Sequence, residues 1–391
     1  MLRQNDTLYT LSFLVLCSSY ALFGASFNML IPELPSFLTS LGGENYKGFI
    51  ISLFTLTAGL SRPISGKLSD TIGRVPVMII GAVVCIVCSL MYPLISGIAG
   101  FLFLRLIHGF STGFTPTAIT AYVADIVPDH RRGEAMGILG VSINLGASAS
   151  PPIGSYLTIV YSLNTMFFVS SGIALLSVLL LVRMKETLPT KEKFRFDMLK
   201  LTWHDLIDRN SLIPAAICGL SYFGFGVVLT IVPDQCEYLG MSNKGMFFTS
   251  ITVFSILSRL VAGKLSDKYG RVVIMTFSAF CLAFSYLLMA FVSSPVELLV
   301  ASGAIGFSIG LMSPALFAWT IDRSSADNRG KAMGTMYIGL ELAIGVGALM
   351  SAAIYQNDGA RFGSVFFVTA VVTSMAILFL LKQRNKSEVI S

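Results

Sequence analysis

The chain has 391 residues, of which 54% are hydrophobic and 12% are charged, and its mean hydropathy is +0.77. The charged fraction is about half that of a soluble domain, which excludes an ordinary soluble protein. The net charge of +6 does not indicate a nucleic-acid partner, because the Lys and Arg residues gather in the gaps between apolar runs. This placement is the bias expected of the cytoplasmic loops of a membrane protein.

Apolar runs of roughly 20 residues, the length that crosses a bilayer core, recur along the whole chain. The first run lacks a small-residue cleavage site, so we interpret it as a retained helix rather than a signal peptide. The pattern predicts an all-α membrane protein with twelve transmembrane helices. The predicted spans are 11–31, 48–66, 75–95, 100–121, 134–157, 165–184, 211–232, 245–263, 272–292, 296–318, 332–354 and 362–381.

The basic residues are distributed unequally between the two sides of these spans. One side carries most of them, and the other keeps only Lys47, Lys244 and Arg361. This asymmetry predicts that both termini are cytoplasmic. The one long gap, residues 185–210, is predicted to be a cytoplasmic linker, with a short amphipathic helix over residues 196–207 on the membrane surface.

An internal repeat organises the chain. Residues 61–78, SRPISGKLSDTIGRVPVM, return as residues 258–275, SRLVAGKLSDKYGRVVIM, and the offset of 197 holds without an insertion from residue 47 to residue 137. A repeat of fixed period marks a duplicated unit. An even number of spans in each unit makes the two units parallel. The predicted organisation is a six-helix bundle over 1–184, the linker over 185–210, and a six-helix bundle over 211–391.

The gap after span two reads GKLSDTIGR, and the gap after span eight reads GKLSDKYGR. A glycine permits two helices to pack closely, an aspartate suits the positive N-terminus of the next helix, and an arginine can pair with that carboxylate. The loop resembles the signature loop of the major facilitator superfamily, to which the chain is similar over nearly its whole length. The resemblance implies a fold of two pseudo-symmetric six-helix bundles. It also implies that these loops form a network that latches the cytoplasmic side shut in one conformation. The alternative to the latch is that the basic residues only fix the topology. The latch residues are Gly66, Asp70, Gly73, Arg74, Gly263, Asp267, Gly270 and Arg271.

The gaps after spans four and ten resemble a secondary gate of the same superfamily. Asp125 and Arg132 occupy the first gap, and Asp322 and Arg329 occupy the second at the same spacing. We expect charge pairing between the two halves to close the cytoplasmic mouth. The alternative is a solvated loop.

Span four contains Arg105-Leu-Ile-His108-Gly, which is similar to the Arg-x-x-Gln-Gly motif of the superfamily. Arg105, His108 and Thr112 share one helical face. An arginine within a span is costly and is treated as a functional residue by default. The alternatives are that Arg105 extends to the outer interface and that His108 is a hydrogen-bonded buried polar group.

Span five contains Gly146, Pro151 and Gly154 in a pattern that resembles the antiporter motif of drug–proton exchangers. Small residues permit close helix packing, and a proline frees a backbone carbonyl and lets the helix bend. The resemblance favours export, and a generic kinked helix is the alternative.

Glu341 is the one carboxylate that we place in the middle of a span, and its repeat equivalent is Asn144. Burial of a carboxylate favours its protonated form, so a proton site or a cation site is expected, with a structural hydrogen bond as the alternative. Many exporters of this kind carry an acidic residue in span one, where this chain has Asn28.

The first hypothesis for function is a proton-coupled exporter of small, largely apolar molecules that resembles the bacterial twelve-helix drug–proton antiporters. The alternatives are a proton-coupled or facilitated importer of a nutrient and, more remotely, a membrane enzyme or sensor. No catalytic pair, metal-ligand cluster or cofactor motif is visible in the sequence, so neither a catalytic residue, a metal nor a cofactor is expected. The expected partners are protons, the cargo and the lipid bilayer, and the expected form is a monomer in the bacterial inner membrane.

Overall fold

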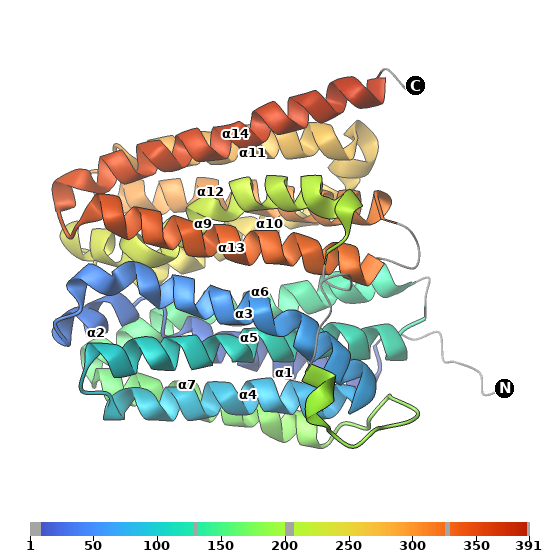
Figure 1. Ribbon diagram of the computed structural model, residues 1–391. Coiled ribbons are helices and arrows are strands. Elements are labelled where there is room, and N and C mark those ends of the chain that lie inside the picture. The colour runs from blue at the N-terminus through green and yellow to red at the C-terminus, as the bar shows by residue number, and fades with distance from the viewer. Residues whose placement is uncertain (1–8, 129–130, 200–206, 325–328, 389–391) are drawn as a thin grey trace.

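The computed structural model describes residues 9–128, 131–199, 207–324 and 329–388. These residues form a bundle of long helices that run roughly parallel to one axis (Figure 1). The helices are α1 Leu11–Asn28, α2 Leu34–Ser40, α3 Lys47–Thr71, α4 Arg74–Met91, α5 Ile98–Ile126, α6 Arg132–Val160, α7 Leu163–Val182, α9 Leu212–Tyr238, α10 Gly245–Tyr269, α11 Arg271–Met289, α12 Pro295–Asp322, α13 Arg329–Tyr355 and α14 Phe362–Glu388.

The repeat in the sequence is a repeat in the structure. The starts of α4, α5 and α6 at Arg74, Ile98 and Arg132 lie 197 residues before those of α11, α12 and α13. Among the described residues, eleven segments are long and apolar enough to cross a membrane, and α6, which is rich in Ser and contains Pro151 and Pro152, is the long helix outside this set. The prediction of an all-α membrane protein in the twelve-helix fold is confirmed.

The two halves differ at their first span. In the first half α1 ends at Asn28, earlier than predicted, and the chain turns before α2 begins with Pro35 in its first turn. In the second half α9 continues without interruption to Tyr238 although it contains Pro233. The break in the first half brings Glu33, which precedes α2, into a buried position.

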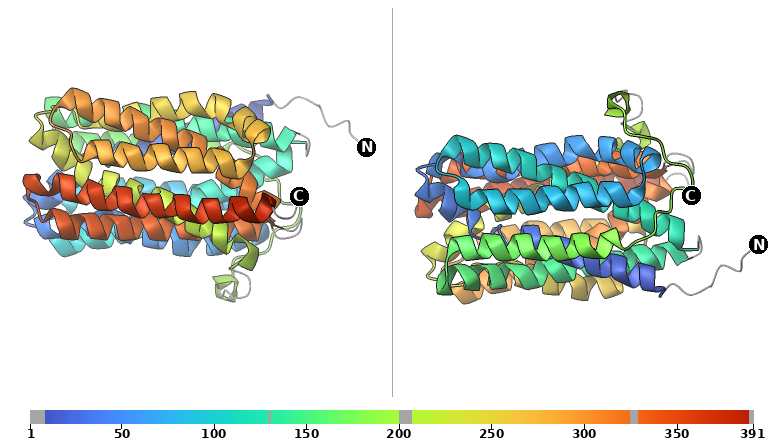
Figure 2. Two further views of the ribbon diagram at one scale, coloured as in Figure 1. Left: turned by 90° about the horizontal axis from the view of Figure 1, so that it is seen from above. Right: turned by 90° about the horizontal axis from the view of Figure 1, so that it is seen from below.

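The halves lie side by side, α1 to α7 in the lower part of Figure 1 and α9 to α14 in the upper part. They meet chiefly where α3 packs against α13 and where α6 packs against α10. In Figure 2 the second half lies in front when the molecule is seen from above, and the first half lies in front when it is seen from below. Helix α1 begins and α14 ends at one end of the bundle, which we call the terminal end; the other we call the far end.

The linker lies at the terminal end and contacts the first half. The Glu192 amide donates to the Thr71 carbonyl at 2.9 Å, and the Tyr122 hydroxyl donates to the Lys185 carbonyl at 2.8 Å. The predicted amphipathic helix is represented among the described residues by one 3-10 turn, Phe196–Leu199. The rest of that prediction falls on residues 200–206, outside the described residues.

Candidate functional site

Contacts between the halves close the far end of the molecule. Lys47 at the start of α3 forms an ion pair with Asp234 of α9, and both side chains are buried. The Asn243 amide donates to the Pro152 carbonyl at 3.0 Å, and the Thr249 hydroxyl donates to the Ser148 carbonyl at 2.5 Å. These bonds join α6 to the start of α10 and to Asn243 just before it, so both lines of contact between the halves are closed at this end.

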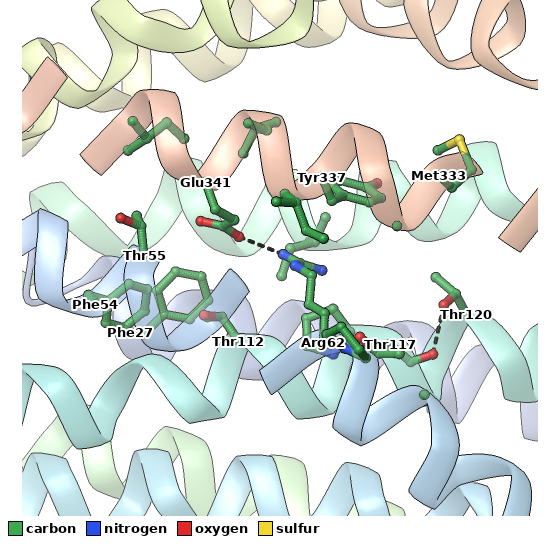
Figure 3. A pocket seen from close by; sticks show the side chains of 18 of the residues that line it. Phe27, Phe54, Thr55, Arg62, Thr112, Thr117, Thr120, Met333, Tyr337 and Glu341 are labelled. Atoms are coloured by element: carbon green, nitrogen blue, oxygen red, sulfur yellow. Dashed lines mark hydrogen bonds and ion pairs between the residues drawn. The ribbon is translucent and has the colours of Figure 1, made fainter. Parts of the chain in front are cut away.

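A cavity of 790 Å³ lies between the halves. Aromatic side chains form much of its wall at mid-depth, including Phe27, Phe54 and Tyr337 (Figure 3). Asp70 and Lys331, at the terminal ends of α3 and α13, also line it. The cavity therefore extends from the middle of the bundle towards the terminal end, opposite to the closed contacts.

An ion pair crosses the cavity wall from one half to the other. Arg62 Nη2 of α3 lies 2.8 Å from Glu341 Oε1 of α13, as Figure 3 shows. Glu341 is only 8% exposed, and the Arg62 guanidinium also lies 4.8 Å from the centroid of the Tyr337 ring. A buried charge is stable only with a partner, so each of these residues supplies what the other needs.

Sequence reasoning missed Arg62, because it was treated as part of the repeated motif rather than as a charge within span two. The signal was present. Arg62 and its repeat equivalent Arg259 both lie inside the predicted spans 48–66 and 245–263. An arginine at such depth calls for a named partner, and the available mid-span carboxylate was Glu341.

Arg105 lines the cavity and is only 3% exposed, so it does not extend to the interface. Its Nε donates to the Ile50 carbonyl at 2.9 Å, its Nη1 donates to the Tyr92 hydroxyl at 3.3 Å, and its guanidinium lies 4.5 Å from the Phe54 ring centroid. These contacts hold Arg105 against α3 and against Tyr92, which directly follows α4, within the first half.

His108 is fully buried behind Arg105. Its Nδ1 lies 3.3 Å from the Tyr92 hydroxyl, and its Nε2 lies 3.4 Å from Cys85 Sγ. It is therefore a hydrogen-bonded core residue in this conformation, which is the alternative that its sequence position left open. Thr112, on the same helical face, does line the cavity.

Asn28 and Asn144 each donate a hydrogen bond to a backbone carbonyl of their own helix. Asn28 lines the cavity, and its Nδ2 donates to the Gly24 carbonyl at 2.8 Å. Asn144 Nδ2 donates to the Gly140 carbonyl at 2.7 Å, one turn earlier on its own helix. Neither amide forms a described bond to the opposite half.

The latch and gate residues form one network in each half. Arg74 pairs with Asp70 at 2.7 Å and with Asp125 at 3.1 Å. Arg271 pairs in the same way with Asp267 and, at 3.2 Å, with Asp322. In this conformation, in which the cavity extends towards the terminal end, the aspartates are paired within their own half, and pairing between the halves on closure stays a prediction. The side chains of Arg132 and Arg329 lie outside the described residues.

The signature glycines have two different roles. A Cβ on Gly66 would meet only Thr117 at 4.0 Å, and a Cβ on Gly263 would meet nothing within 4 Å, so neither glycine lies at a close helix contact in this conformation. Gly73 and Gly270 instead adopt φ of +121° and +90°, conformations that favour glycine, in the turns before α4 and α11.

A linker carboxylate, not Asp70, occupies the N-terminus of α4. The Glu186 carboxylate accepts from the backbone amides of Arg74 and Val75 at 3.0 and 3.1 Å and also from those of Thr187 and Leu188. Burial opposes ionisation of Glu186, but the amide donors prevail and hold the pKa of this carboxyl below its ordinary value. The expected contact of Asp70 with the helix N-terminus is therefore replaced by its pair with Arg74.

The antiporter-like helix is a packing element. Gly146 and Gly154 of α6 lie against α1, where a Cβ would come within 2.0 Å of the Ala21 carbonyl oxygen and 2.4 Å of the Met29 carbonyl oxygen. Pro151 lies against Gly245 of α10. This helix therefore joins α1 on one side and the second half on the other.

Two pseudo-symmetric helical halves, closed at one end around a central cavity, define a membrane transporter rather than an enzyme. Among the described residues no group of His, Cys, Asp and Glu is arranged to hold a metal. The family model for the Major Facilitator Superfamily matches residues 16–242 and 215–390, so the chain belongs to that superfamily, as its motifs indicated.

Known relatives cover almost the whole chain. The multi-drug resistance efflux pump PmrA of Streptococcus pneumoniae is 28% identical over 383 residues, 93% of each chain. The multidrug resistance protein MdtG of Escherichia fergusonii is 27% identical over 389 residues, 94% of each. The crystal structure of a D-xylose-proton symporter superposes with a TM-score of 0.78 at 19% identity, over 94% of this chain and 96% of that one, which supports the fold.

Proposed function

We propose that this protein is a proton-coupled exporter of small, largely apolar molecules, acting by alternating access as a monomer in the bacterial inner membrane. The observation that supports coupling most directly is the Arg62–Glu341 ion pair, which joins the two halves in the wall of the cavity. The names of the relatives PmrA and MdtG support export. On this proposal the terminal end is cytoplasmic, and this conformation accepts cargo from the cytoplasm.

Glu341 carries the proton in this mechanism. In the conformation described here Glu341 is paired with Arg62 in a cavity that extends towards the terminal end, so we place release of the proton to the cytoplasmic side in this conformation. Opening the far end requires α3 and α13 to move apart, because Gly48 of α3 packs directly on Ala348 of α13 there. Separated from Arg62 in an apolar wall, Glu341 takes up a proton from the outer side.

The cavity wall suits apolar cargo. Phe27 and Phe54 stack with ring centroids 6.3 Å apart, and the Tyr337 ring completes the wall beside Arg62. Aromatic and aliphatic surfaces bind small molecules through burial of apolar area, with a few polar groups to orient them.

Transport into inverted membrane vesicles tests this function. With an acidic lumen, vesicles that contain the protein should accumulate members of a panel of cationic, neutral and anionic fluorescent dyes, and a protonophore should release them. Accumulation of the same dyes with the opposite gradient would favour an importer, and no gradient-dependent accumulation of any dye would contradict proton coupling.

A further inference from the structure

The Arg62–Glu341 pair uses only part of the hydrogen-bonding capacity of its two side chains. A guanidinium and a carboxylate can each form several hydrogen bonds. One bond joins them here, from Arg62 Nη2 to Glu341 Oε1. Within the described part of the chain, Arg62 Nη1 has no acceptor and Glu341 Oε2 has no donor. The pair therefore keeps an unused donor group and an unused acceptor beside each other.

Both unused groups are accessible from the cavity. Arg62 and Glu341 line it, and Figure 3 shows their side chains reaching into it from opposite walls, α3 and α13. The Arg62 side chain is 18% exposed and that of Glu341 is 10% exposed. Arg62 Nε is buried, whereas Nη1 and Glu341 Oε2 are not. These two atoms are thus the polar groups of the pair that a molecule in the cavity can reach.

The charges of the pair favour a neutral group at this position. A cation placed at Glu341 Oε2 would also lie beside the Arg62 guanidinium, and an anion placed at Arg62 Nη1 would also lie beside the Glu341 carboxylate. Like charges so close together repel strongly in an apolar wall. Arg105 offers cargo little surface, because it is only 3% exposed. A neutral group with a donor next to an acceptor avoids both repulsions and satisfies both unused atoms.

We propose that the cavity binds neutral cargo through an amide group, whose carbonyl accepts from Arg62 Nη1 and whose N–H donates to Glu341 Oε2. This inference rests on the proposed function, since it names the substrate class of the same cavity. The aromatic wall at Phe27 and Phe54 receives the apolar body of the cargo. When Glu341 takes up a proton on the outer side and parts from Arg62, the two bonds are lost together and the cargo leaves.

Equilibrium binding to the purified protein at neutral pH, without a gradient, tests the proposal with two probes of the same shape. In 2-naphthamide the carbonyl carries an NH2 group, and in 2-acetonaphthone it carries a methyl group. The wild type should bind naphthamide about tenfold more tightly than acetonaphthone, the effect of one hydrogen bond to a charged group. The anion 2-naphthoate should bind no more tightly than acetonaphthone, because it meets the Glu341 carboxylate.

Three variants separate the two bonds. Glu341→Gln gives its carbonyl oxygen to Arg62 and presents NH2 where the carboxylate accepted, so the preference for naphthamide should disappear while acetonaphthone binds as before. Arg62→Lys keeps the charge but lacks the planar fork of donors, so both probes should bind severalfold more weakly and the preference should remain. Glu192→Gln makes the same acid-to-amide change in the exposed part of the linker and should behave as the wild type.

Equal affinity of the wild type for naphthamide and acetonaphthone, or no measurable binding of naphthamide, would overturn the proposal. Tighter binding of naphthoate, or a naphthamide preference that survives in Glu341→Gln, would do the same. If Glu341→Gln fails to fold, Arg62→Lys decides in its place, and unchanged affinity for both probes in that variant would count against the proposal. A naphthamide preference without proton-driven transport contradicts only the proposed function, and coupled transport without the preference contradicts only this inference.

Discussion

Arg62 and Glu341 bind each other across the two halves at 2.8 Å, whereas their repeat equivalents Arg259 and Asn144 form no pair. The duplicated fold is symmetric in its helices and asymmetric in its charges. In the proposed mechanism the paired side responds to protons, because its carboxylate gains and loses a partner when the halves move.

The Arg62–Glu341 pair predicts a particular order of stabilities. Glu341→Leu leaves a partly buried arginine in the cavity wall without its acceptor, which costs about 1–3 kcal/mol. The double variant Arg62→Leu/Glu341→Leu removes both charges and should recover most of this loss. Unfolding in detergent, followed by circular dichroism, measures the free energy of unfolding. A double variant less stable than Glu341→Leu alone would show that the two residues do not form a pair in the folded protein.

The Lys47–Asp234 pair is expected to stabilise the conformation that is closed at the far end. Asp234→Asn leaves Lys47 without its buried partner and should shift the population towards a conformation that is open at this end. In a background without native cysteines, Thr249→Cys should then react with a membrane-impermeant maleimide about tenfold faster, the effect of ~1.4 kcal/mol on a two-state equilibrium. Arg361→Gln, which removes an exposed cation near the same end, is the control and should not change the rate.

The Glu186 cap predicts a dependence on pH. The pKa of Glu186 in the folded protein is lowered, so its contribution to linker docking is complete above the ordinary glutamate pKa of about 4.3 and is lost as the pH falls through the lower folded value. Hydrogen exchange at the amides of Arg74 and Val75 should therefore accelerate, beyond its intrinsic pH dependence, in that acid range. Glu186→Gln should exchange rapidly at neutral pH, and Glu192→Gln should behave as the wild type. Full protection of both amides in Glu186→Gln would contradict the cap.

The two turn glycines predict a graded effect of alanine. Gly73 and Gly270 both have positive φ, where an alanine costs about 1–2 kcal/mol. At Gly73 the added Cβ would also come within 2.4 Å of Glu186 Oε2, whereas at Gly270 it would meet nothing within 4 Å. We expect Gly73→Ala to lower the melting temperature more than Gly270→Ala. Gly172→Ala should lower it least, because a Cβ on this residue within α7 would meet nothing within 4 Å. The reverse order for Gly73 and Gly270 would mean that the linker does not dock as described.

The repeat explains why so much of the fold was predictable. An offset that holds from residue 47 to residue 137 fixes the ends of most helices twice, and each apolar run limits where a helix crosses the bilayer. Glu341 was identifiable because a carboxylate within an apolar run is costly and is treated as a functional residue by default. The end of α1 at Asn28 was not, because Pro32 and Pro35 allow either a kinked helix or a break.

The partners of the charged residues were less predictable than their positions. Periodicity shows which face of a helix a residue occupies, but not which helix of the other half lies against that face. Arg62 was therefore not linked to Glu341. Pairing of Asp125 with the other half is expected only when the cytoplasmic mouth closes, and in this conformation Arg74 of its own half binds it. Glu186 lies in a polar gap, where the sequence does not show which helix end the carboxylate will reach.

Proton coupling through Glu341 is tested most directly in liposomes that contain the purified protein, with an imposed pH gradient and a dye that the vesicle assay identifies as cargo. Glu341→Gln keeps an acceptor for Arg62, so the fold should be preserved, but its side chain cannot exchange a proton. We predict that this variant loses gradient-driven accumulation of the dye while dye exchange at equal pH continues at a rate close to that of the wild type. Full proton-driven accumulation by Glu341→Gln would contradict the account and would make Glu341 a structural partner of Arg62.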